Sequence, residues 1–97
     1  MTDEQRLAML KIDIGFRSSG NTAIDERLTQ LLQVAEKNII SEGATTLDKN
    51  ELSDAQLIVM YAAWLWRRRD TQDDMPRMVR YAINNRVFSE KMAGDNT

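Results

Sequence analysis

Residues 55–66, AQLIVMYAAWLW, decide the fold, because every residue except Gln56 is apolar. A helix that is apolar on all sides is normally buried on all sides. One domain of three or four short helices can hardly cover such a helix completely. We therefore expect another subunit to cover part of it, with the large aromatic side chains as anchors.

Two helices are predicted before this segment. Thr2 and Gln5 form a capping box for a short helix that ends near Lys11. A longer helix is expected to begin with Thr22 as its cap and to stop at Gly43. Its apolar residues follow one another at steps of three or four, which indicates a single buried stripe. The stripe consists of Ile24, Leu28, Leu31, Leu32, Ala35 and Ile39.

The connections are polar and contain turn formers. Residues 11–21 predict an extended loop whose apolar side chains, Ile12, Ile14 and Phe16, pack on the helices. Residues 44–52 predict a second connection, anchored by Leu47 and Leu52. Ser53 or Asp54 is expected to cap the helix that follows.

A fourth helix is predicted from Pro76, which suits the first turn of a helix. Its expected apolar face consists of Met78, Val79, Ala82, Ile83 and Val87. The chain has 97 residues, a single proline and four glycines, which fits one domain with long stretches free of helix breakers. The predicted fold is therefore all-α: a compact bundle of three to four helices over residues 1–97, with an extended loop after the first helix and a flexible tail at about 93–97.

Several kinds of chemistry are excluded by composition. The chain contains no cysteine and no histidine, which removes disulfides, thiolate chemistry, soft-metal sites and the usual base of a catalytic triad. The acidic pairs Asp25–Glu26 and Asp73–Asp74 lie at predicted helix starts, where the positive end of the helix dipole stabilises acidic side chains. Adjacent side chains on a helix do not face each other, so neither pair forms a catalytic dyad. We expect no catalytic site, no metal and no cofactor, so the chain is not predicted to be an enzyme.

Charge and hydropathy point to a soluble protein made in a cytoplasm. The net charge of −2 does not indicate a nucleic-acid footprint over the whole surface. The longest apolar run is about half of what a bilayer requires, and the N-terminal MTDEQRLAML lacks the pattern of a signal peptide. Acidic residues outnumber basic ones in residues 1–66 and the reverse holds in 67–97, which favours head-to-tail contact between copies.

The candidate interaction site lies at the end of the apolar segment. Guanidinium groups bind phosphate and carboxylate bidentately, but three successive arginines on a helix point about 100° apart and form no flat patch. Complementing the helix dipole is the simpler alternative for them. Trp64 and Trp66 lie about 200° apart, so both cannot face one core. We expect Trp64 in the core, and we predict a subunit interface at Trp66, Arg67, Arg68 and Arg69.

Other functions remain open at this point. A small helical DNA-binding or regulatory protein of a mobile element is the main alternative, because the fourth helix carries Arg77, Arg80 and Arg86. Such a protein shifts DNA in a gel assay at low salt. An enzyme subunit or chaperone would instead co-purify with a single partner in fixed stoichiometry.

The order of these segments resembles the small head–tail connector (head-completion adaptor) proteins of tailed bacteriophages. In that family a leucine-rich start and a turn rich in Asp, Asn and Ser precede a helix of the form D-x-x-L-x-x-L-x-x-A. The corresponding residues are Asp25, Leu28, Leu31 or Leu32, and Ala35. A later helix with a run such as AILLLVAHWYENR is similar in character to residues 55–69, and a frequent proline start corresponds to Pro76. The similarity covers residues 7–88, but the chain lacks the histidine often found before the tryptophan and has a long loop at 44–52.

The resemblance implies a subunit of a ring, commonly of twelve copies, beneath the portal. Such a ring extends the DNA channel, helps to retain the packaged genome and binds the next neck or tail-completion protein. The implied partners are further copies of the chain, the portal protein and that neck protein, with no membrane and no sequence-specific DNA contact. The implied location is the virion neck, after assembly in the bacterial host cytoplasm. A near-neutral or acidic protein suits a channel that passes DNA without gripping it.

Overall fold

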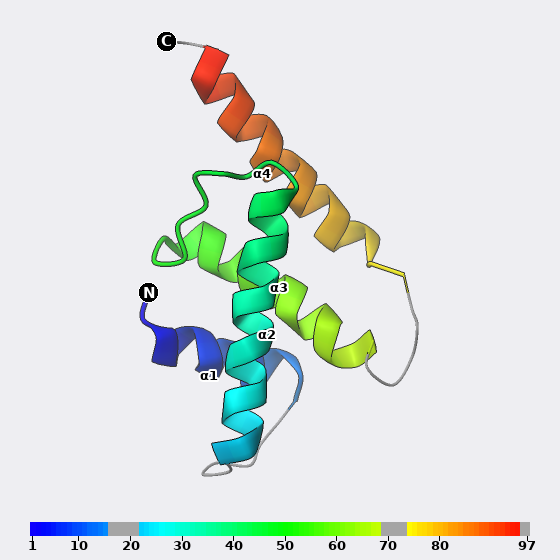
Figure 1. The fold of residues 1–97 in the computed structure, drawn as a ribbon. Helices are drawn as coiled ribbons and strands as arrows, with labels where there is room; N and C mark the ends of the chain where they lie inside the picture. The colour runs from blue at the N-terminus through cyan, green and yellow to red at the C-terminus, as the bar shows by residue number, and fades with distance from the viewer. Residues whose placement is uncertain (16–21, 69–73, 96–97) are drawn as a thin grey trace.

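The computed structural model describes residues 1–15, 22–68 and 74–95, and it places four helices within them (Figure 1). In chain order they are α1 (Asp3–Asp13), α2 (Thr22–Ser41), α3 (Leu52–Arg68) and α4 (Arg77–Asp95). The described ranges contain no strand. The predicted all-α bundle is therefore confirmed.

Helix α3 lies at the centre and packs against α1, α2 and α4 (Figure 1). Its apolar residues are buried on several sides, as the composition of the segment requires. Those buried are Ala55, Leu57, Ile58, Val59, Tyr61, Ala62 and Ala63. Met60, Trp64, Leu65 and Trp66 are half-buried and pack against the same core. The chain itself thus provides most of the cover for α3 that we expected from another subunit.

The long stripe on α2 supplies much of the rest of the core. Five of its predicted residues are buried, and Ile24 is half-buried against them. Fully burying a leucine or isoleucine side chain contributes roughly 1.5–3 kcal/mol. Leu10 of α1 and Val79 and Ile83 of α4 complete the cluster. The single-stripe interpretation of residues 22–41 is therefore confirmed.

Three predicted helix ends are present. Thr2 and Gln5 form the capping box of α1: the Gln5 amide donates to Thr2 Oγ1 at 3.2 Å, and the Thr2 amide donates to Gln5 Oε1 at 2.8 Å. Helix α2 ends at Ser41, and Gly43 follows with φ +128°, a conformation that favours glycine. Pro76 directly precedes α4, and its carbonyl accepts a hydrogen bond from the Arg80 amide at 3.1 Å.

The predicted cap of α3 was wrong. The helix begins at Leu52, before both predicted caps, and the Glu51 carboxylate accepts the Asp54 amide at 2.9 Å. Leu47 packs against the core as predicted, but Leu52 is 55% exposed and does not anchor its loop. It stands at the first position of the helix, beyond the cover of the neighbouring helices.

Two segments are more helical than expected. Helix α1 continues to Asp13, so Ile12 is helical and 77% exposed, whereas Ile14 packs against the core as predicted. Phe16 and the rest of the loop up to residue 21 lie outside the described residues. At the other end of the chain, α4 continues through residues 93–95, the first three residues of the predicted tail. Extending an existing helix adds one hydrogen bond per residue, which favours continuation over fraying.

Candidate protein-binding surfaces

The predicted interface lies where α3 ends. Trp66 is half-buried, and Arg67 and Arg68 are exposed; Arg69 lies outside the described residues. Arg67 Nη2 donates to the carbonyl oxygen of Asp13 at 2.8 Å, which ties this end of α3 to the end of α1. The Arg68 guanidinium lies 5.0 Å from the centre of the Trp64 ring, a cation–π contact. Both described arginines therefore make contacts within the chain.

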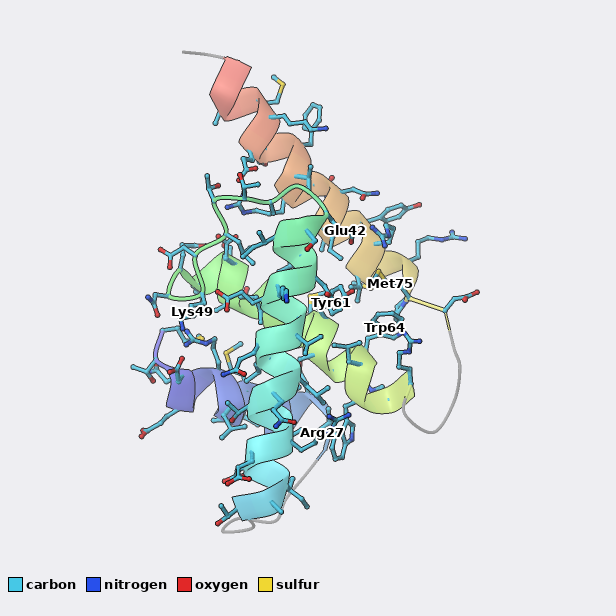
Figure 2. All side chains as sticks on the ribbon, viewed as in Figure 1. Arg27, Glu42, Lys49, Tyr61, Trp64 and Met75 are labelled. Carbon is cyan, nitrogen blue, oxygen red and sulfur yellow. The ribbon has the colours of Figure 1, made fainter. Side chains whose placement is uncertain are left out.

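The two tryptophans of α3 do not divide into one core and one surface residue. Both are half-buried, and both pack against the core. Trp64 meets Tyr61 edge to face, with ring centres 5.5 Å apart and planes at 85° (Figure 2). Tyr61 itself is only 7% exposed, so it is the aromatic side chain that α3 buries most completely.

A polar cluster fixes α4 to the start of α3. Arg86 Nε donates to Asp54 Oδ1 at 2.7 Å, and Arg86 Nη2 donates to Thr46 Oγ1 at 3.1 Å. The Asp54 side chain is 9% exposed, and its other oxygen accepts the Asp48 amide at 3.0 Å. The hydrogen bond to this carboxylate raises the pKa of Arg86 above its already high value. These contacts join α3, α4 and the 44–51 connection.

Glu90 of α4 holds the same connection. Its Oε1 accepts both the amide and the hydroxyl of Thr46 at 2.5 Å, and its Oε2 accepts the amide and hydroxyl of Thr45 at 2.9 and 3.0 Å. The hydrogen bonds from Thr46, and then those from Thr45, favour the ionised form and lower the pKa of Glu90 to about 2. Glu90 therefore works as a clamp on the loop and not as a proton donor near neutral pH.

The arginines of α4 are largely engaged within the chain. Arg80 Nη1 pairs with Glu42 Oε1 at 2.8 Å, and Glu42 lies at the end of α2 beside α4 (Figure 2). Arg86 pairs with Asp54, as described above. Of the three arginines considered for DNA contacts, two thus form ion pairs with carboxylates. This arrangement disfavours a DNA-reading role for α4.

Residues of α1, α2 and α3 line a small cavity. This cavity of about 90 Å³ lies beside the buried Arg6, whereas ligand pockets typically measure ~300–1,000 Å³. Arg6 is instead a structural residue, since its guanidinium donates to the carbonyl oxygens of Met1 at 2.8 Å and Lys49 at 2.6 Å. No group of three or more acidic residues in the described ranges is placed to hold a metal ion. None of the four helices is long and apolar enough to cross a membrane.

One exposed apolar surface was missed by the sequence analysis. Met78, Tyr81, Phe88 and Met92 are 76%, 57%, 63% and 47% exposed, and we refer to these four residues as the outer face of α4. At 100° per residue they lie on the side of the helix opposite Val79, Ile83 and Val87. Met78 was predicted for the buried face, and the structure corrects this.

The signal for this face is present in the sequence. Residues 78, 81, 85, 88 and 92 are spaced by three and four, and all are apolar except Asn85. A groove of about 210 Å³ continues the surface from Phe88 towards the end of α2. Its lining includes Glu42, Ile83, Asn84, Val87 and Lys91.

No protein-family model matches this chain, and neither does any curated protein or solved structure. The chain's own surfaces are therefore the features that bear on its function. Ile12, Val34 and Leu52 are the other exposed large apolar side chains of the described residues, and each stands on a different helix. Single exposed apolar residues are ordinary, whereas a contiguous group marks an interaction surface. The outer face of α4 is the strongest candidate.

Proposed function

We propose that this chain is a protein-binding subunit of a larger assembly and that the outer face of α4 is its main docking surface. The observation that carries this proposal is the concentration of four large apolar side chains on one side of one helix. Covering them removes apolar surface from water, and aromatic anchors such as Tyr81 and Phe88 typically dominate the binding energy. The role requires no catalytic group.

More specifically, we propose a head–tail connector of a tailed bacteriophage. The sequence resemblance supports this version, together with a near-neutral charge that suits a DNA-conducting ring. Copies of the chain then form a ring, commonly of twelve, under the portal in the virion neck. The ring joins the portal to the next neck or tail-completion protein, and DNA passes without sequence-specific contact. Trp66, Arg67, Arg68 and Arg69 are proposed as the portal contact.

Electron microscopy of the purified chain, alone and mixed with the portal protein encoded in the same genome, tests this proposal. We expect rings with a central channel, either free at high concentration or on the portal. Replacing Arg68 by Glu should weaken portal docking while leaving the helix content unchanged in circular dichroism. A chain that stays monomeric and ignores the portal would refute the connector role. A DNA shift in a low-salt gel would favour the mobile-element regulator instead.

A further inference from the structure

We infer that the outer face of α4 pairs with the outer face of α4 in a second copy of this chain, with the two helices parallel and in register. The inference rests only on the coarser part of the proposed function, that the chain binds protein through this face. It depends neither on a ring nor on a phage.

The residues of the outer face have the spacing of a coiled-coil seam. Met78, Asn85 and Met92 are seven residues apart, and Tyr81 and Phe88 occupy the intervening positions three residues after Met78 and Asn85. This is the a/d pattern of a two-stranded coiled coil over two heptads, with Asn85 at the middle a position. A seam of this kind is self-complementary, because the same residues meet across a two-fold axis.

Asn85 is the polar residue within this apolar seam. Asn85 is exposed, like the four apolar residues around it. An amide buried in an apolar interface is costly unless it finds a hydrogen-bond partner. In a parallel, in-register pair each Asn85 meets the other, and an asparagine at an a position favours two strands in this arrangement.

The residues beside the seam favour the parallel orientation. In a parallel pair, Arg77 of one copy lies beside Ala82 of the other, and Asn84 lies beside Ser89. No like charges meet there. An antiparallel pair centred on Asn85 would instead bring Arg77 near Lys91, and like charges that close repel each other. Arg77 and Lys91 are both exposed in the single chain.

The outer face of α4 is accessible, and the apolar area that it presents is consistent with a reversible dimer. The body of the chain lies on the opposite side of α4, and the last turns of α4 extend beyond the other helices (Figure 1). Four large, largely exposed side chains present on the order of 500 Å². A standard interface buries about 800 Å² on each partner, so the pair belongs at the weak end of stable association.

Sedimentation equilibrium of the full chain over a wide concentration range tests the pairing. We expect a monomer–dimer equilibrium that Phe88→Glu weakens roughly 30- to 100-fold. Val34→Glu is the matched control, because Val34 is 45% exposed on α2, and it should leave the equilibrium unchanged. Circular dichroism of both variants establishes that each remains folded.

Cross-linking tests the orientation, since the chain contains no cysteine of its own. Met78→Cys and Met92→Cys should each form a disulfide-linked dimer alone on oxidation, whereas Gln30→Cys, on the exposed side of α2, should not. A disulfide that forms only when the Met78→Cys and Met92→Cys chains are mixed shows an antiparallel pair and overturns the inference.

The outcomes separate this inference from the proposed function. A chain that is monomeric at every concentration overturns the pairing, even if it binds a portal. Rings in which neither single-cysteine variant cross-links also overturn the pairing and retain the connector role. Asn85→Leu should tighten the association or shift it to larger species, because the amide limits both strand number and register. An unchanged equilibrium in that variant contradicts the seam.

Discussion

Asp54 joins three parts of the chain through one carboxylate, because it contacts Arg86 of α4 and the Asp48 amide from its position in the first turn of α3. The side chains of the Asp54–Arg86 pair are 9% and 21% exposed, whereas those of the Arg80–Glu42 pair are 41% and 33% exposed. Removing one member of a buried pair leaves an uncompensated charge, while an exposed pair contributes little.

We therefore expect different costs for the two pairs in chemical denaturation. Asp54→Ala should lower the free energy of unfolding by about 2–3 kcal/mol, somewhat less than for a fully buried pair because Arg86 retains solvent contact. Glu42→Ala should cost less than about 1 kcal/mol. Equal losses in the two variants would show that burial of the Asp54 pair does not set its contribution.

Glu90 gives a prediction about pH. Its pKa falls from 4.5 to about 2 in the folded chain, because Thr46 and Thr45 donate hydrogen bonds to the ionised carboxylate. A carboxyl group whose pKa is lower in the folded than in the unfolded chain stabilises the fold at every pH above its unfolded pKa. This contribution disappears as the pH falls through the folded pKa. Glu90→Gln should therefore be less stable than the wild type near neutral pH, with the difference shrinking between pH 4.5 and 2. Glu26→Gln, an exposed carboxylate on α2, controls for the loss of one charge; a difference independent of pH would contradict the assignment.

At the scale of elements, the end of α2 depends on a glycine that a side chain would disturb. Gly43 has φ +128°, and a Cβ there would lie 3.0 Å from Val87 Cγ1 on α4. Gly43→Ala should therefore combine backbone strain with displacement of α4 and cost about 2 kcal/mol or more. Gly15→Ala is the matched control, because Gly15 also has a positive φ of +74° but open space around it. Thermal unfolding should show the larger loss for Gly43→Ala; a smaller one would mean that α4 yields freely at this contact.

The helices differ in whether their sequence alone identifies the face that packs against the core. Residues 22–41 carry one apolar stripe, so the period alone identifies the face that is buried. Helix α4 carries two, Val79–Ile83–Val87 and the outer face, and the period cannot tell which one meets the core. Met78 was misplaced for this reason. The ion pairs of Arg80 and Arg86 were equally inaccessible to sequence reasoning, because they join residues far apart in the chain.

At the scale of the whole molecule, the chain is more extended than a typical domain. The radius of gyration is 13.9 Å, compared with about 12.5 Å expected for a compact domain of this length. The protruding end of α4 accounts for much of the length (Figure 1). The fold class followed from composition and periodicity. The extent to which α1, α2 and α4 cover α3 could not be predicted from the sequence, because it depends on the angles at which the helices cross. A subunit with one projecting helix is suited to contact a neighbour through it.

The methyl signals of the methionines give the most direct test of the central claim, that the outer face of α4 is the docking surface. Met78 and Met92 lie on that face, whereas Met9 and Met60 are half-buried against the core. In nuclear magnetic resonance of dilute protein, a soluble paramagnetic agent should attenuate the Met78 and Met92 methyl signals most strongly. When the chain associates with itself or with a partner, these two signals should become protected while those of Met9 and Met60 stay unchanged. Association that leaves Met78 and Met92 as accessible as before would contradict the claim and place the contact elsewhere on the chain.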